Sequence, residues 1–481
     1  MKKIKIAFSF AIFSPFCGAS KAQAQLKIPA LFSDNMVLQQ QSHPQIWGWS
    51  TANSKVSVTV SWGKEKFQSN ADKDGKWKIQ LSTPSAGGPY LIHIQSGSSK
   101  VDINNVLIGE VWLCTGQSNM EMPMKGFRDT PIANSADDIM NSKNSKLHFI
   151  KIPRSSQTVP QDSAKYSQWM EATPGSVSNF SATGYYFGRM LQKMLDVPVG
   201  LISVNYGGSK AEAWMDSAVL ASVGDIKIPQ RGDAIKSVNQ TPTVLFNGML
   251  RPVIGYGIKG CIWYQGESNY DNPKQYETLF PTMVHRWREL WGQGDFPFYF
   301  AQIAPFNYAS LPPYYSGGKY NSAFLRDAQR KSLKTIPNSA MVSLMDIGEE
   351  DNIHPKHKKE GGERFAFLAL DNVYGMKDYT LACPTYDSMV VAGNVVTLHF
   401  LNTRNGLTSY GKPLQQFEIA GADKVFHPAN AVITQGKLKV SSPYVAAPVA
   451  VRYAFKDFVV GDLFNTEGLP MASFRTDDWD Y

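Results

Sequence analysis

Between residues 106 and 378, short apolar runs alternate with stretches of helical periodicity, and this alternation is the feature that most restricts the fold. The expected strands are 106–114, 146–152, 199–204, 258–264, 298–303 and 340–346, and the expected helices are 183–195, 276–291, 323–334 and 358–374. Such a pattern predicts a parallel sheet with helices on both faces. Ligands of these sheets bind at the carboxyl ends of the strands, so functional residues are expected just after a strand.

The segments on either side of this region have a different texture. Residues 25–105 and 379–481 contain short alternating stretches separated by clusters of Gly, Asn, Asp and Ser, which is typical of β-sandwich modules. The chain has 481 residues, which is too long for one ordinary domain. We therefore expect an N-terminal β-sandwich module at 25–105, an α/β domain at 106–378 and a C-terminal β module at 379–481.

The first 24 residues have the pattern of a secretory signal peptide. Three lysines precede the apolar run 6–16, and Ala22-Gln23-Ala24 fits a small-x-small cleavage site. A membrane anchor is the alternative, but the apolar run is shorter than the roughly 20 residues that span a bilayer. We expect export to a periplasm or the cell exterior, with cleavage after Ala24 and no membrane span.

Charge and cysteine content exclude several classes of protein. Cleavage would remove four lysines and no acid, so the formal net charge of +8 would fall to +4, and no basic run predicts a nucleic-acid face. Cys114, Cys261 and Cys383 would remain, an odd number that argues against a disulfide framework, and we expect Cys114 and Cys261 to be buried core residues.

No metal-binding or dinucleotide motif stands in the right context, so we expect no metal and no cofactor. The sequence does not indicate how many subunits assemble.

Ser118 is the candidate nucleophile. The apolar run that ends at Cys114 stops at Thr115-Gly116-Gln117-Ser118-Asn119, as a buried strand ends in a tight turn that carries one hydroxyl. The alternative is a turn without chemistry, because Gly, Ser and Asn favour turns for conformational reasons. The motif also lacks the second glycine of the common hydrolase elbow.

A serine hydroxyl needs a base, and the usual base is a histidine oriented by a carboxylate. Only His354 has an acid three residues before it, in Asp351-Asn352-Ile353-His354. Asp351 could instead cap the helix expected from Lys358. The position of this pair after the last expected strand, with Ser118 after the first, favours a catalytic triad.

Donors to a tetrahedral oxyanion are expected at two other strand ends. Gly207 and Gly208 follow one strand and suit a close backbone approach, or form only a sharp turn. Gln265 and Asn269 offer side-chain amides after the next strand. The role of Glu267, either as a supporting hydrogen-bonding residue or as a substrate contact, stays open.

With these residues assembled, the chain resembles the sialate O-acetylesterase family of SGNH-type carbohydrate esterases. The motifs that carry the resemblance are GEVWLCTGQSNMEMPM, Tyr206-Gly207-Gly208-Ser209 followed by Ala213-Trp214-Met215, IWYQGESN, Arg326-Asp327-Ala328-Gln329, DNIHP and GLPMASFRTDDW. The resemblance implies an SGNH-hydrolase (flavodoxin-like) three-layer fold with a flanking β module. It also implies that Ser118 is the nucleophile, His354 the base, Asp351 its orienting acid and Gly207 an oxyanion donor.

The chain departs from this family at two places. Many SGNH hydrolases have G-x-N where this chain has Gly266-Glu267-Ser268-Asn269, so the asparagine is displaced by one residue and Gln265 competes with it as the third donor. At the second place, Asn205-Tyr206 stands where the family usually has a turn with a tryptophan-type aromatic residue. Ser209 stands there where the family more often has threonine.

The expected function is that of an exported serine esterase that removes O-acetyl groups from sugars, with sialate O-acetylesterase as the leading activity. A plant-polysaccharide acetylesterase acting on xylan, xyloglucan or pectin is the alternative within the enzymes, and a non-catalytic carbohydrate-binding protein is the alternative outside them. Four aromatic residues near the motifs could form a sugar-stacking wall or belong to the core: Trp112, Trp214, Trp263 and Tyr264. The expected partner is an acetylated carbohydrate.

Overall fold

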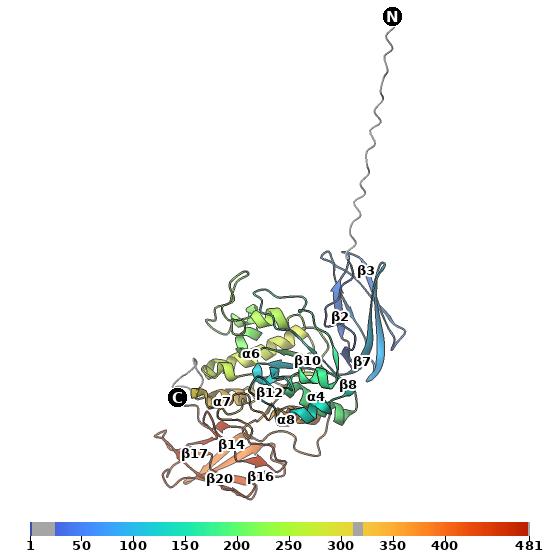
Figure 1. Cartoon of the computed structure of the whole chain (residues 1–481). Helices are drawn as coiled ribbons and strands as arrows, with labels where there is room; N and C mark the ends of the chain where they lie inside the picture. Colours follow the sequence, from blue (N-terminus) through green and yellow to red (C-terminus); the bar gives the residue numbers. More distant parts are fainter. Residues whose placement is uncertain (2–24, 311–320, 480–481) are drawn as a thin grey trace.

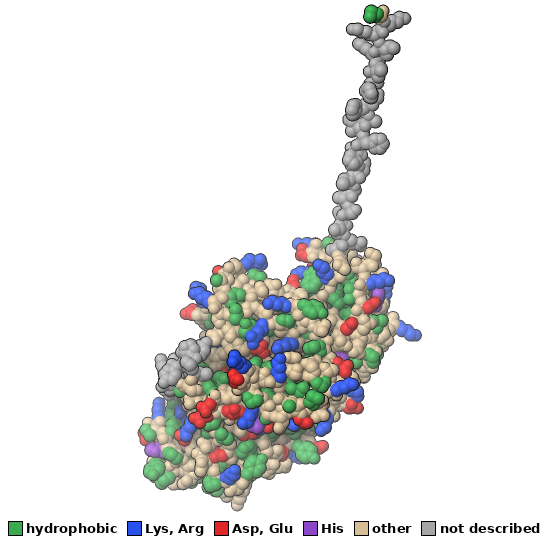
Figure 2. All heavy atoms as spheres, in the orientation of Figure 1, with side chains coloured by type: hydrophobic (Ala, Val, Ile, Leu, Met, Phe, Trp, Pro, Cys, Tyr) green, Lys and Arg blue, Asp and Glu red, His purple; other side chains and the backbone are tan. Residues whose placement is uncertain are grey.

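A computed structural model describes residues 1, 25–310 and 321–479. Figure 1 shows an N-terminal β module in blue, a central region of strands and helices in cyan to light orange, and a C-terminal β module in orange and red. The expected signal peptide falls on residues that the structure leaves undescribed, apart from Met1. Among the described helices, none has both the length and the apolar character of a membrane span. Basic and acidic side chains are interspersed over the face seen in Figure 2.

The central sheet confirms the parallel topology expected from the sequence. Its strand order is β13 (Ser339–Val342), β12 (Phe298–Ala301), β11 (Gly260–Tyr264), β7 (Ser99–Gly116), β10 (Val199–Asn205), β8 (Asn144–Lys151) and β9 (Met170–Ala172). Neighbouring strands run parallel except for β9, which is antiparallel to β8. Gly116, the last residue of β7, pairs with Asn205 on one side and with Tyr264 on the other. The carboxyl ends of three strands therefore meet at one edge.

Helices cover both faces of this sheet, as expected. The long ones are α4 (Ala182–Leu195), α6 (Pro273–Trp291), α7 (Ala323–Ser332) and α8 (Lys358–Asn372). Alternate residues of β7 enter different cores: Val111 and Leu113 pack with residues of α6, whereas Trp112 and Cys114 pack with residues of α4 and α8. A strand buried on both faces reads as a continuous apolar run, which explains the sequence signal.

Shorter helical segments lie in the connections. They are α1 (Ser118–Glu121), α2 (Ser135–Met140), α3 (Pro174–Ser178), α5 (Ser217–Leu220), the 3-10 turns η1 (Ala211–Trp214), η3 (Glu267–Asn269) and η4 (Tyr308–Ser310), and a π-helical turn η2 (Phe246–Leu250).

The N-terminal module shares a strand with the central region. Its own strands are β1 (Val37–Gln39), β2 (Gln45–Trp49), β3 (Lys55–Val60), β4 (Lys66–Asn70), β5 (Lys76–Gln80) and β6 (Gly87–Ser96). The first part of β7 pairs antiparallel with β6, and its second part forms the middle of the central sheet. The boundary expected at residue 105 therefore falls inside one continuous strand.

The C-terminal module is antiparallel and docks on α7. Its strands are β14 (Thr385–Ala392), β15 (Val395–Leu401), β16 (Leu407–Thr408), β17 (Phe417–Ala420), β18 (Phe426–Pro428), β19 (Asn430–Thr434), β20 (Lys437–Ser441), β21 (Ala450–Tyr453), β22 (Phe464–Asn465) and β23 (Phe474–Arg475). Arg475 Nε lies 3.0 Å from Oδ2 of Asp327, a fully buried residue of α7. Nε2 of Gln302, next to β12, donates to the carbonyl of Ser473 at 2.9 Å.

Candidate active site

Ser118 lies directly beyond the carboxyl end of β7. Gly116 ends the strand with φ +144°, and a Cβ at this position would lie 2.1 Å from the carbonyl oxygen of Tyr264. Only glycine fits so close to this carbonyl. The chain leaves the sheet after Gly116, and α1 starts at Ser118. Ser118 is partly exposed, whereas the next three residues are buried. The strand, the turn and an accessible hydroxyl are as the sequence predicts.

His354 lies on the loop between β13 and α8, and one side chain joins this loop to the serine turn. Nδ2 of Asn119 donates to the main-chain carbonyl of Ile353 at 3.0 Å. The neighbour of Ser118 in the sequence is thus bonded to the neighbour of His354. The structure therefore brings together the two turns that the sequence places 236 residues apart in numbering.

The imidazole of His354 is held in its neutral form. Burial, followed by the charge of Lys358, lowers its pKa to about 4, and the ring packs edge-on against Phe127 with centroids 5.2 Å apart. A neutral imidazole can accept a proton near neutral pH, which is what a general base requires. Among the residues that the structure describes, neither the Ser118 hydroxyl nor the His354 ring has a hydrogen-bond partner.

Asp351 is exposed, and within the described residues no hydrogen bond joins it to His354. The loop is organised instead by Glu349, whose carboxylate accepts from the main-chain N–H of Lys356 at 2.8 Å and from Nδ2 of Asn352 at 3.2 Å. Catalytic hydrogen bonds are often longer in free enzymes than in their complexes. The assignment of Asp351 as orienting acid therefore stays a prediction.

A buried polar network supports the two turns from behind. Oδ1 of Asn119 accepts from Nζ of Lys358 at 2.6 Å, and its Nδ2 donates to Oε1 of Glu267 at 2.5 Å. Burial lowers the pKa of Lys358 to about 7 and raises that of Glu267. Glu267 thus lies in the supporting position that was one of its two expected roles. Asn119 and Lys358 were missed from the sequence, although Asn119 lies inside the recognised motif.

Gly207 is adjacent to the nucleophile, and its peptide is held on both sides. A Cβ at position 207 would lie 3.4 Å from Cβ of Ser118. The N–H of Gly207 donates to Oε2 of Glu121 at 2.7 Å, and its carbonyl accepts from Nδ2 of Asn239 at 2.7 Å. In the free protein the expected oxyanion donor is therefore bound to a carboxylate.

Arg154 pairs with that carboxylate and reaches solvent. Its Nε donates to Oε1 of Glu121 at 2.7 Å and its Nη2 to Oε2 at 2.5 Å. The guanidinium lies 4.5 Å from the ring centroid of Tyr206, and the Arg154 side chain is 51% exposed, whereas that of Glu121 is 4% exposed. An exposed cation beside Ser118 and Gly207 was not predicted, because no motif around residue 154 marks it.

The other expected donors have protein partners. Nε2 of Gln265 donates to the carbonyl of Ser209 at 3.1 Å and to Oδ1 of Asn269 at 2.7 Å. Nδ2 of Asn269 donates to Oε2 of Glu212 at 2.9 Å. Gly208 has φ +67°, a left-handed turn conformation that favours glycine. The structure thus shows these residues bracing the strand ends, and the choice of a third oxyanion donor stays a prediction.

The four aromatic residues near the motifs belong to the core. Trp112, Trp214 and Trp263 are fully buried and Tyr264 is 2% exposed, so they do not form a sugar-stacking wall. Cys114 and Cys261 are buried and free, as expected. In the described ranges, no three His, Cys, Asp or Glu side chains are grouped as a metal would require.

The chain is similar to known carbohydrate esterases in sequence and in fold. The family described as "Carbohydrate esterase, sialic acid-specific acetylesterase" matches residues 108–370, a range that includes Ser118 and His354. Sialate O-acetylesterases of Homo sapiens and Mus musculus are 28% and 29% identical, over 74% of this chain and 73% and 75% of their own lengths. The crystal structure of a carbohydrate acetylesterase from Xanthomonas citri is 34% identical with a TM-score of 0.85, and the match covers 94% of this chain and 100% of that one.

Proposed function

The chain belongs to the sialic acid-specific acetylesterase family of carbohydrate esterases, and we propose that it hydrolyses O-acetyl esters on sugars, with an O-acetylated sialic acid as the leading substrate. One observation carries the proposal: the hydrogen bond from Asn119 to Ile353 holds the Ser118 turn against the His354 turn. The relatives named above, which are described as sialate O-acetylesterases and a carbohydrate acetylesterase, support the choice of substrate.

The reaction follows the chemistry of an activated serine. Oγ of Ser118 attacks the acetyl carbonyl carbon while the imidazole of His354 accepts the hydroxyl proton. The tetrahedral intermediate collapses, the sugar oxygen leaves with that proton, and the acetyl group stays on Ser118. Water, deprotonated by His354, then attacks the acetyl carbonyl carbon of the acetyl-enzyme. The bond from that carbon to Oγ of Ser118 breaks, His354 returns the proton to Oγ, and acetate leaves. We assign the oxyanion donor to the N–H of Gly207, which must exchange the Glu121 carboxylate for the substrate oxygen.

Arg154 supports an acidic sugar as substrate. Two of its nitrogens hold Glu121, while half of the side chain remains exposed beside the serine. A guanidinium can bind a carboxylate with charge-assisted hydrogen bonds, and sialic acids carry a carboxylate where neutral polysaccharides carry none.

Two further features complete the proposal. We assign the α/β region to the SGNH-type hydrolase fold, flanked by β-sandwich-type modules, because parallel strands end at the serine and antiparallel sheets lie on either side. We also propose that the protein is exported and works in a periplasm or outside the cell, on the strength of the N-terminal signal pattern.

Acetate release tests the function. Wild type and Ser118→Ala are compared on O-acetylated sialic acid and on acetylated xylan. We expect the sialic acid to lead and the variant to lose about three or more orders of magnitude in kcat. Faster release from xylan would favour a plant-polysaccharide acetylesterase, and binding without release by wild type would favour a carbohydrate-binding protein. Wild-type activity in Ser118→Ala would contradict the triad.

A further inference from the structure

A cavity of about 360 Å³ opens between the N-terminal module and the α/β region. One wall comes from β2 and β5, and the other from Asp162 and the segment around Arg251. Figure 2 shows a hollow between these two parts of the molecule. None of the residues of the candidate active site lines the cavity. It is large enough for a small-molecule ligand.

The outer face of β2 and β5 lines this cavity with aromatic and polar side chains. Residues of β2 alternate, so that Gln45, Trp47 and Trp49 lie on the partly exposed face while the residues between them are buried. The antiparallel register sets Trp47 opposite Lys78 and Trp49 opposite Lys76. Both tryptophans on this outward face are only partly buried, so part of their apolar surface can meet a ligand.

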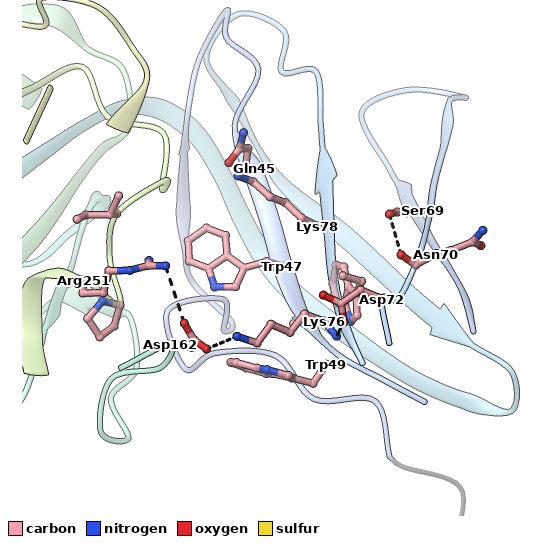
Figure 3. A pocket seen from close by; sticks show the side chains of 14 residues that line it. Gln45, Trp47, Trp49, Ser69, Asn70, Asp72, Lys76, Lys78, Asp162 and Arg251 are labelled. Atoms are coloured by element: carbon pink, nitrogen blue, oxygen red, sulfur yellow. Dashed lines mark hydrogen bonds and ion pairs between the residues drawn. The ribbon is translucent and has the colours of Figure 1, made fainter. Parts of the chain in front are cut away.

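Contacts within the module fix the ring of Trp47 and the main chain of Trp49. Trp47 packs edge-on against Phe32 with ring centroids 4.6 Å apart, and the main chain of Trp49 is bonded to Lys27 through both its N–H and its carbonyl. Figure 3 shows the two rings on either side of the ion pair between Lys76 and Asp162. A rigid aromatic platform loses little conformational entropy on binding.

The charged residues between the rings can accept new partners. Nζ of Lys76 lies 2.6 Å from Oδ2 of Asp162, and Nη2 of Arg251 lies 3.9 Å from Oδ1 of the same carboxylate. These side chains are 52%, 46% and 42% exposed for Lys76, Asp162 and Arg251. Ion pairs this exposed contribute little stability, so a ligand with several hydroxyl groups can share their donors and acceptors at small cost.

From this combination we infer a second carbohydrate-binding site, at which a pyranose unit of a glycan chain stacks on Trp49, while Trp47 lines the same cavity beyond the ion pair. The ring C–H groups of a pyranose form an apolar face that matches an indole, and its equatorial hydroxyls point toward Asp162, Lys76 and Arg251. The inference rests on the proposed carbohydrate substrate, and it implies that the esterase is retained on a chain that extends beyond the sugar at Ser118.

Calorimetric titration with deacetylated oligosaccharides tests the site, since the product chain lacks the ester that the active site needs. One titration uses a sialyl-oligosaccharide and the other a xylo-oligosaccharide, to identify the source of the pyranose. We expect Trp49→Ala to weaken binding of the better ligand about tenfold, and Trp49→Phe, which restores a ring, to recover part of it. Trp62→Ala is the matched control, because Trp62 belongs to the same module but does not line the cavity.

Kinetics separate this site from the catalytic one. Trp49→Ala is expected to raise KM for the acetylated glycan chain about tenfold while leaving kcat/KM on 4-nitrophenyl acetate within about twofold. Equal oligosaccharide binding by wild type and Trp49→Ala, or equal weakening in Trp62→Ala, would overturn the inference. A failure of the proposed function would look different, because no acetate would be released while binding at Trp49 stayed measurable.

Discussion

The main-chain N–H of Gly207 donates to the carboxylate of Glu121 over 2.7 Å, directly beside the nucleophile. Glu121 comes from the short helix that Ser118 begins, and Gly207 follows the neighbouring strand β10. The bond therefore fixes the position of one strand end relative to the next. The amide assigned to the oxyanion is thus held by a carboxylate from the same short helix that begins at Ser118.

Substitution of Gly207 by alanine tests how closely this peptide approaches Ser118. The new Cβ would lie 3.2 Å from Oε2 of Glu121 and 3.4 Å from Cβ of Ser118, so it crowds both the hydrogen bond and the space of the acetyl group. We expect kcat/KM on 4-nitrophenyl acetate to fall by about tenfold to a hundredfold. Gly175→Ala is the control, since nothing lies within 4 Å of its added Cβ, and equal activity of the two variants would contradict the prediction.

Much of the fold follows from the sequence because of how burial works in a parallel sheet. The second part of β7, from Val106, and the strands β10 and β11 are buried on both faces and read as continuous apolar runs. Turn residues follow each run, which locates Ser118 and Gly207. His354 was found because an acid precedes it at a short spacing.

The remaining features depend on tertiary placement. The bond from Asn119 to Ile353 joins segments that no local pattern relates, and the partners of Gln265 were unpredictable because an amide side chain can face a ligand or the protein. The sequence pattern changes near residue 105, where we expected a domain boundary, for a different reason. The texture changes there because β7 passes from a half-exposed sheet into a buried one, although the strand itself continues.

Asn119→Ala should destabilise the fold and slow the reaction. The change leaves the carboxylate of Glu267, the amine of Lys358 and the carbonyl of Ile353 without a bond each makes to Asn119. Unpaired buried polar groups cost about 1–3 kcal/mol each and more when charged, so we expect urea unfolding to show a loss of about 3 kcal/mol. The exposed Asn405, which donates to Glu467, provides the control Asn405→Ala, expected to change stability by less than about 0.5 kcal/mol. A similarly small change in Asn119→Ala would show that the network is not needed.

Asp351→Asn tests whether the carboxylate that is exposed in the free protein orients His354 during the reaction. If Asp351 closes onto the ring when substrate binds, its loss leaves the wrong tautomer populated, and we expect kcat to fall about a hundredfold or more. Glu350→Gln, at the neighbouring position, should retain activity within about twofold. An equally small effect of Asp351→Asn would mean that the loop held by Glu349 positions His354 without a carboxylate partner.

The pH dependence of kcat/KM should report the environment of His354. A protonated imidazole cannot act as base, so activity falls as the pH drops through its pKa, which burial and the charge of Lys358 lower to about 4. We expect a plateau above about pH 5. In Lys358→Met the burial of His354 remains and the nearby charge is gone, so the pKa of His354 should rise. The fall of kcat/KM at low pH (the acid limb of the profile) should then occur at higher pH. Lys356→Met, which removes an exposed lysine from the same loop, should leave the limb in place, and an unmoved limb in Lys358→Met would contradict the charge effect.

Arg154→Ala separates two roles of the exposed guanidinium. Loss of the ion pair leaves the buried carboxylate of Glu121 without its cation, so every substrate should react more slowly. If Arg154 also binds the carboxylate of a sialic acid, kcat/KM on O-acetylated sialic acid should fall about tenfold further than on a neutral sugar acetate, as expected for the loss of a hydrogen bond to a charged group. Arg154→Lys, which keeps the charge but loses the two-pronged geometry, should recover part of this selectivity, and Arg128→Ala, at a residue 95% exposed, should not change it. Equal losses on both substrates would make Arg154 a positioning residue for Glu121 alone, and the case for an acidic sugar would then rest only on the relatives.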